Sequence, residues 1–207
     1  MDDADFDRAL VGAAFALAAE RGWRDVSVAE AARRADLPLD RTRRRFPVRG
    51  AILMRFGRMA DEQALALAPK EGPHRDRLFD MLMRRVDALQ THRAGVLALL
   101  RALPADPCLA AFLAMASLRS MGWMLEGAGI SARGPLGRLR RKGLFGVWLA
   151  MLRAWRNDTS EDLSATMAAL DRALSQAERV EGWLTGRRSA PEPSSPSVPD
   201  APAAGAL

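Results

Sequence analysis

Apolar residues recur along this chain at intervals of three and four, the spacing that buries one face of an α-helix. In the first segment, about residues 5–21, Phe6, Leu10 and Leu17 follow this spacing, and Gly22 ends it. No stretch alternates apolar and polar residues for long enough to indicate a strand. The composition agrees, because Ala, Leu, Arg and Glu are abundant while Tyr is absent. The pattern therefore predicts an all-α fold.

The next segments predict two short helices joined by a tight turn. The run from Ser27 to Glu30 reads Ser-Val-Ala-Glu, a capping box. In this motif the Ser27 hydroxyl accepts from the Glu30 amide, and the Glu30 side chain returns to Ser27. Helices are expected at about 28–34 and 39–46, and Pro47 ends the second one. Such a pair is typical of a helix-turn-helix.

The remaining pattern divides the chain into three parts. A fourth helix from about residue 49 follows the three-helix helix-turn-helix module and closes the N-terminal, DNA-binding domain, residues 1–68. Residues 74–186 carry apolar stripes typical of a C-terminal bundle of four or five more helices. Residues 187–207 are expected to be a disordered, Pro-rich tail, because five of the twelve prolines follow Ser189 and almost nothing there is apolar.

Positive charge is concentrated in the helix-turn-helix. The whole chain has a formal net charge of +6, whereas residues 31–60 alone hold nine Arg against two acids, a local charge of +7. Duplex DNA favours a focused positive face, because binding releases condensed counterions. The alternative is an Arg-rich solvated face with no partner. The nine residues are Arg33, Arg34, Arg41, Arg43, Arg44, Arg45, Arg49, Arg55 and Arg58.

Several classes of protein are not expected. Cys108 is the single cysteine, which excludes an internal disulfide and a Cys-based zinc site. His74 and His92 have no carboxylate pattern around them, so no metal is expected. No acid/base pair, nucleophile motif or phosphate loop points to an enzyme or a cofactor. No signal peptide is visible and no apolar run approaches the ~18 residues that a membrane span needs, so a cytoplasmic protein is expected.

Several short sequence motifs between residues 13 and 53, and the number of helices over about residues 5–186, match one known protein family. The stretch resembles the N-terminal domain of TetR-type transcriptional regulators, in which a longer helical ligand-binding and dimerisation domain follows. The matching pieces are Ala13-Ala14-Phe15-Ala16-Leu17, Arg21-Gly22-Trp23, the run from Val26 to Ala32, Ala35-Asp36-Leu37-Pro38, and Phe46 with Arg49, Ile52 and Leu53.

This resemblance implies a DNA-binding repressor of transcription that is released from its operator by a small apolar effector. Its expected partners are double-stranded DNA, a second copy of the chain and that effector. Carried over position by position, Ser27 and Arg49 contact phosphate, and Arg41, Arg43 and Arg44 face the groove.

The chain also departs from the family pattern. Asp36-Leu37-Pro38 stands where Gly-Val-Ser is usual, and Arg41-Thr42-Arg43 stands where Thr-Leu-Tyr is usual. Loss of the tyrosine removes a common phosphate contact, which Arg43 replaces with a charged one.

A second resemblance competes with the first. The run from Trp155 to Leu163 and the later Leu170-Asp171-Arg172 resemble the C-terminal part of ubiquinone-biosynthesis accessory proteins, which bind isoprenoid lipids on a TetR-like fold. That family implies contact with a membrane through residues 180–184, with Trp183, and no DNA binding. The Arg cluster of the helix-turn-helix argues against it.

Two groups of apolar residues in the second domain have candidate roles. A seam of Leu163, Met167, Leu170 and Leu174 on the last helix, together with the stripe of the preceding helix, is expected to pair with its symmetry mate as a four-helix dimer interface. Large, adaptable side chains are expected to line an apolar ligand cavity, with plain core packing or a dimer seam as the alternative. They are Phe112, Met115, Trp123, Trp148, Met151 and Trp155.

Overall fold

The computed structural model describes residues 1–69 and 71–184, and every regular element in those ranges is a helix. The predicted disordered tail, residues 187–207, lies outside them. The all-α prediction is confirmed for the described ranges. In chain order the elements are α1 (Asp3–Arg21), the 3-10 turn η1 (Trp23–Asp25), α2 (Val28–Arg34), α3 (Leu39–Arg45), α4 (Arg49–Ala66), α5 (His74–Thr91), α6 (Arg93–Ala102), the 3-10 turn η2 (Leu103–Ala105), α7 (Pro107–Gly127), α8 (Gly134–Asn157) and α9 (Ser164–Leu184).

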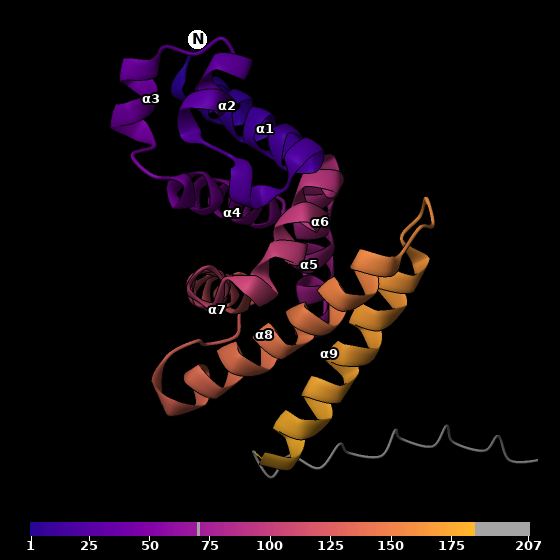
Figure 1. Ribbon diagram of the computed structural model, residues 1–207. Helices are drawn as coiled ribbons and strands as arrows, with labels where there is room; N and C mark the ends of the chain where they lie inside the picture. Colours follow the sequence, from indigo (N-terminus) through magenta and orange to yellow (C-terminus); the bar gives the residue numbers. More distant parts are fainter. Residues whose placement is uncertain (70, 185–207) are drawn as a thin grey trace, which may run out of the picture.

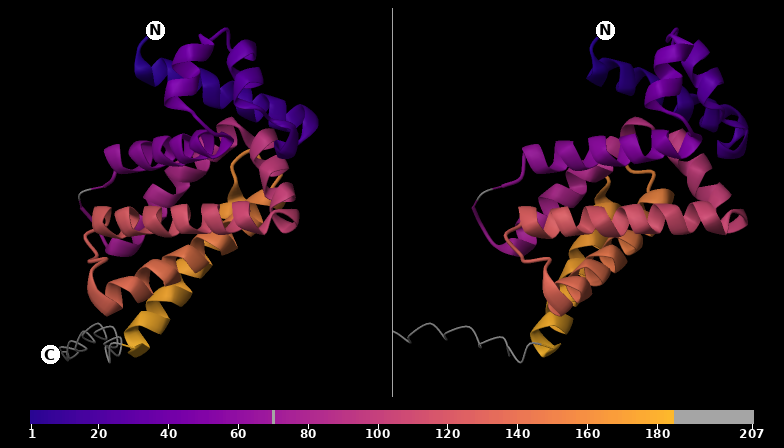
Figure 2. Two further views of the ribbon diagram at one scale, coloured as in Figure 1. Left: turned by 60° about the vertical axis from the view of Figure 1, so that its left-hand side comes forward. Right: turned by 90° about the vertical axis from the view of Figure 1, so that its left-hand side faces the viewer.

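The helices form a small end and a large end that share one apolar core. Figure 1 shows α1, α2 and α3 gathered at the N-terminal end, and α8 and α9 lying side by side at the other. Helix α4 contacts α1 as well as α5 and α7, and α6 packs on α1. In both views of Figure 2, α7 runs below α4 and roughly along it. The two ends are therefore joined by packed helices.

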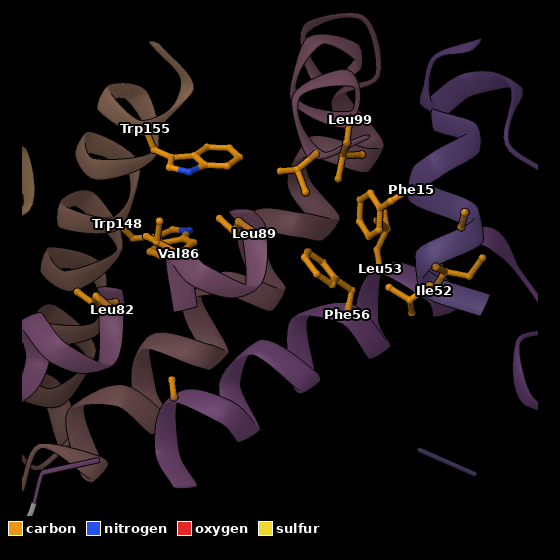
Figure 3. Close-up of a cluster of buried hydrophobic side chains, with 14 of the residues drawn as sticks. Phe15, Ile52, Leu53, Phe56, Leu82, Val86, Leu89, Leu99, Trp148 and Trp155 are labelled. Atoms are coloured by element: carbon orange, nitrogen blue, oxygen red, sulfur yellow. The ribbon is translucent and has the colours of Figure 1, made fainter. Parts of the chain in front are cut away.

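An aromatic cluster fills the junction between the two ends. The Phe15 ring of α1 lies 4.6 Å from that of Phe56 on α4 and 5.5 Å from the His92 imidazole, which stacks on it at 11°. Figure 3 shows Phe15 and Phe56 facing Leu99 of α6. Burial lowers the pKa of His92, which favours the uncharged form of its ring. The cluster fixes α6 against the N-terminal end.

A second apolar group lies between α8 and the middle of the molecule. Trp148 and Trp155, both buried, project from α8 toward Leu82 and Leu89 of α5 (Figure 3). The Trp155 indole N–H donates to Gln90 Oε1 at 2.9 Å, so its polar atom is satisfied.

The prediction that the apolar seam of α9 forms a dimer interface is wrong. Leu163, Leu170 and Leu174 are buried within the single chain, where α9 packs on α8 and α5. Met167 is half-buried. The narrow stripe on α9 is used by the chain's own core, because a helix at the edge of a bundle has no other apolar face to bury.

Helix α7 is an exception to the expectation that no segment is suited to span a membrane. An 18-residue window of α7 has a mean hydropathy of 1.4, and 22 % of it is buried. By length and composition α7 alone, among the described residues, is long and apolar enough to cross a membrane, which is weak evidence for a span. Ser117, Arg119 and Ser120 interrupt its apolar residues, so no continuous apolar run in the sequence reaches the length of a span.

Gly95 on α6 lets the backbone of α1 come close, and this predicts a sharp response to a methyl group. A Cβ at Gly95 would lie 2.2 Å from the Phe15 carbonyl oxygen, so Gly95→Ala must push α6 off α1. Such overpacking costs about 1–3 kcal/mol. Gly57→Ala on α4 is the matched control, since nothing lies within 4 Å of its added methyl, and it is expected to stabilise by up to about 1 kcal/mol. Urea unfolding of both variants tests this prediction. Equal unfolding midpoints for Gly95→Ala and Gly57→Ala would contradict the close contact between α6 and α1.

Candidate nucleic-acid interface

The connection between α2 and α3 forms the expected tight turn. Ser27 Oγ accepts from the Glu30 amide at 3.1 Å and begins α2. Asp36 takes a positive φ of 53°, which Asp tolerates better than most residues and which Gly usually fills. Leu37 follows, with its side chain buried and its amide donating to the Ala32 carbonyl at 2.9 Å. Asp36-Leu37-Pro38 therefore forms the tight turn even though it departs from the Gly-Val-Ser that is usual in the family.

The capping box is only half made. The Glu30 carboxylate pairs with Arg21 at the end of α1 and does not return to Ser27. An arginine offers a charged hydrogen bond, which is stronger than a second bond to a neutral amide. The pair ties α2 to α1 instead of closing the cap.

A buried carboxylate fixes α3 against its support. Asp7 of α1 is fully buried, and it accepts from Arg45 Nη2 at 2.8 Å as well as from Arg45 Nε and Arg55 Nε. Burial alone would raise the pKa of Asp7, but the hydrogen bonds from Arg45 and Arg55 overcome it and hold the pKa below its usual value. One anion thus joins α1, α3 and α4.

The side chains of α3 divide into three groups. Thr42 is buried and its hydroxyl donates to the Pro38 carbonyl at 2.8 Å, so it faces the core. Arg41 turns back to the N-terminus, where it pairs with Asp3 and lies 4.4 Å from the centre of the Phe6 ring. Arg43 and Arg44 are exposed.

Of the exposed pair, Arg44 bonds Asp40 one turn earlier at 2.9 Å, with both side chains open to solvent. Arg43 has no ion-pair partner within the ranges that the structure covers. Arg33 on α2 is exposed and likewise unpaired there. Figure 1 places α3, which carries Arg43 and Arg44, at the outer edge of the molecule.

The contacts of Arg49 differ from its predicted role as a phosphate ligand. Its Nη1 donates to the Trp23 carbonyl at 3.0 Å and to the Arg24 carbonyl at 2.7 Å, which anchors α4 to η1. The guanidinium is half-buried beside Trp23. The predicted phosphate contacts at Ser27 and Arg49, like the groove contacts at Arg41, Arg43 and Arg44, stay predictions.

The six predicted ligand-binding residues are not brought together. Trp148, Met151 and Trp155 of α8 are buried in the core of the protein, whereas Phe112, Met115 and Trp123 are exposed on α7. Two shallow hollows that the described residues outline contain none of the six. One is lined by Arg75, Asp76, Phe79, Asp80 and Asp171, and the other by Asp3, Arg41, Arg44 and Arg45.

Several important residues are not identified by the sequence patterns. The patterns give Asp7 no role, and they place Arg45 and Arg55 only in a charge cluster. The sequence does contain a signal that Asp7 is buried. Phe6, Leu10 and Ala14 repeat every four residues on one helix face, and Asp7, one residue after Phe6, borders that buried face. No cluster of three or more metal-ligating side chains occurs in the described part of the chain.

Removing the Asp7 charge tests whether it holds α3 in place. Asp7→Asn keeps the shape but leaves Arg45 and Arg55 with only their exposed partners, Asp3 and Glu62, so we expect a loss of about 3 kcal/mol in the free energy of unfolding. The wild type loses this contribution as the pH falls through the lowered pKa of Asp7, and the variant does not. Asp5→Asn, at an exposed position, is the control and should unfold at the wild-type urea concentration. An unchanged midpoint in Asp7→Asn would show that the cluster does not support the fold.

Comparison with known proteins adds a finding about the fold. No protein-family model and no curated protein matches the chain. A TetR transcriptional regulator from Nitrosomonas europaea ATCC 19718 has 23 % identity and a TM-score of 0.68, over 84 % of this chain and 99 % of that one. A tetR-family regulator from Streptomyces coelicolor has 19 % identity and a TM-score of 0.59, over 89 % and 85 %. A TetR regulator from Rhodococcus sp. RHA1 has 20 % identity and a TM-score of 0.50, over 86 % and 97 %. The chain has the fold of TetR-type transcriptional regulators.

Proposed function

We propose that the protein is a cytoplasmic DNA-binding regulator of transcription, a homodimer whose hold on an operator is released by a small apolar effector. The observation that carries the proposal is the outward pair Arg43 and Arg44 on α3, the second helix of the helix-turn-helix. In such modules this helix enters the major groove, and Arg is suited to bidentate contacts with guanine and phosphate.

The supporting contacts keep α3 ready for this role. Arg45, held by Asp7, keeps the helix against α1, while Arg44 and Arg43, one and two positions earlier, stay free of the core. The exposed Arg33 adds positive charge from the neighbouring helix. A rigid support with solvated cations on its outer side favours docking on a duplex at low ordering cost.

The groove-facing arginines give the first test of this proposal. Arg43→Ala/Arg44→Ala should abolish the preference for DNA upstream of the protein's own gene, at a cost of about 1–3 kcal/mol for each arginine that bonds a base. For each arginine that bonds a phosphate instead, the slope of log K against log salt should fall by about one. The matched control is Arg101→Ala/Arg119→Ala, which removes the same charge from exposed positions on α6 and α7 and should leave binding unchanged.

Fluorescence anisotropy with promoter and random duplexes at physiological salt measures both effects. If the wild type shows no preference for its own promoter region, the DNA proposal is wrong. The lipid-accessory function then takes its place.

One observation favours that second function. Phe112, Met115 and Trp123 leave α7 with an exposed apolar face, and their exposed fractions are 37 %, 70 % and 62 %. The predicted membrane contact at Trp183 concerns a side chain outside the described residues. Isoprenoid lipid extracted with the purified protein, together with flotation on liposomes and no DNA binding, would support the accessory function.

The homodimer is proposed to form through the outer face of α8, with α9 beside it. Leu139 and Leu149 are exposed there, at 47 % and 49 %, and nothing lies within 4 Å of a Cβ built at Gly143 or Gly146. Exposed leucines beside small residues allow a second helix to approach closely. Two-fold symmetry would then present two α3 helices to a palindromic site.

Charge on this face is expected to separate the protomers. Leu139→Glu/Leu149→Glu alters side chains that are already half-exposed, so each chain should still fold while sedimentation shows monomer. Met115→Glu, which places the same charge on the apolar face of α7, is the control and should remain dimeric. A monomeric wild type at micromolar concentration would count decisively against the dimer. A dimer broken only by Met115→Glu would move the interface to α7.

A further inference from the structure

Two oppositely charged side chains meet inside the large end of the molecule. Arg85 of α5 is 6 % exposed, and its Nε lies 3.2 Å from Oδ1 of Asp61 on α4. The side chain of Asp61 is 14 % exposed, and its second oxygen accepts from the Ser120 hydroxyl on α7. The pair therefore joins α4, α5 and α7 at one point.

The guanidinium of Arg85 is incompletely satisfied. Its charged carbon lies 4.6 Å from the centre of the Trp148 ring on α8, a cation–π contact. Its Nη1 is buried, and it has no hydrogen-bond partner among the described residues. A buried donor on a charged group is costly to leave unpaired, so this atom marks a position suited to an acceptor.

Stability alone does not explain this ion pair. Burial raises the pKa of Asp61 even though Arg85 and Ser120 act to lower it, and burial lowers the pKa of Arg85 against the pull of Asp61. The attraction therefore does not fully offset the removal of both charges from water. Apolar residues of similar volume would serve the core at least as well, which favours a role in binding.

We propose that Arg85 is the receptor for the carboxylate of a small apolar acid, and that Asp61 is an internal competitor which this carboxylate displaces. The planar fork of a guanidinium matches a carboxylate, whose two oxygens can take the vacant Nη1 and its neighbour Nη2 together, and one buried cation cannot neutralise two carboxylates at once. Trp148, which already contacts the guanidinium, provides an apolar surface for the rest of the acid.

The displaced Asp61 has a route to water, because its side chain already reaches the surface. Its departure breaks the ion pair with Arg85 of α5 and the hydrogen bond from Ser120 of α7. Six positions earlier on the same helix, Arg55 bonds the buried Asp7 that supports α3. Release of α4 is thus transmitted toward the helix-turn-helix, and this consequence rests on the proposed function in DNA binding.

Thermal unfolding of the full chain tests the binding step without DNA. The probes are hexanoate, benzoate and 4-phenylbutyrate, each compared with its primary amide. At least one acid should raise the Tm of the wild type in a concentration-dependent way, while its amide should not. Asp61→Asn removes the competitor and should bind that acid about tenfold more tightly, because the receptor is then free before the ligand arrives.

Two further variants keep the test decisive. Arg85→Met alone leaves Asp61 buried without its partner and risks misfolding, so the informative variant is Asp61→Asn/Arg85→Met, which carries neither charge and should fold but not respond. Arg84→Met, the same change one position earlier, should respond like the wild type. If no acid stabilises Asp61→Asn, or if the response survives in the double variant, the receptor is not Arg85.

DNA binding is then measured with the same acid. A stabilising acid that weakens promoter binding in the wild type but not in the double variant supports the whole proposal. DNA binding without any acid response overturns the receptor and leaves the regulator standing. An acid response without DNA binding supports the receptor and overturns the proposed function.

Discussion

The arrangement of the N-terminal end depends on the neutralisation of one buried anion, Asp7. A carboxylate with no access to water cannot remain ionised in an apolar surrounding unless cations reach it. Arg45 and Arg55 reach it from α3 and α4, which are separate in sequence, so the charge requirement sets the relative positions of three helices. The hydrophobic core holds these helices together, but an apolar core tolerates small slides and rotations. The directional bonds of the two guanidiniums do not, and they fix which side of α3 faces outward.

Helix α4 links this anchor to the larger end of the molecule. One stretch of it carries Arg55, which binds Asp7, and a later stretch carries Asp61, which binds Arg85 of α5. A helix transmits displacement well because its backbone bonds resist bending. Coupling between sites requires an element with two arrangements whose balance each site can bias. An ion pair whose burial is poorly compensated is a suitable place for such a balance, since the removal of both charges from water opposes the attraction that keeps the pair closed.

Local pattern was enough to predict the class of fold and most helix limits, because period, caps and breakers act within a few residues. Gly22 and Pro47 end helices near the expected positions, and the Ser27 cap begins α2 as predicted. The partners of charged groups could not be obtained in this way. Arg41 pairs with Asp3, and the seam at Leu170 meets the chain's own α8, through tertiary contacts that no local spacing encodes. For the same reason the predicted ligand residues, correctly marked as large and apolar, are divided between the core and an exposed face.

The tertiary pairs also change what the Arg cluster means for a nucleic acid. A count of charges between residues 31 and 60 treats all nine arginines as equivalent, whereas their partners separate them into classes. Arg45 is bound to a buried carboxylate, which a phosphate cannot replace without leaving Asp7 inside the core with Arg55 as its one remaining cation. Arg41 is bound to Asp3, whose side chain is 65 % exposed, so an incoming phosphate exchanges one solvated anion for another at little cost. Arg43 has no anion to give up. The positive face is therefore graded, with Arg43 free at once, Arg41 available by exchange and Arg45 reserved for the fold.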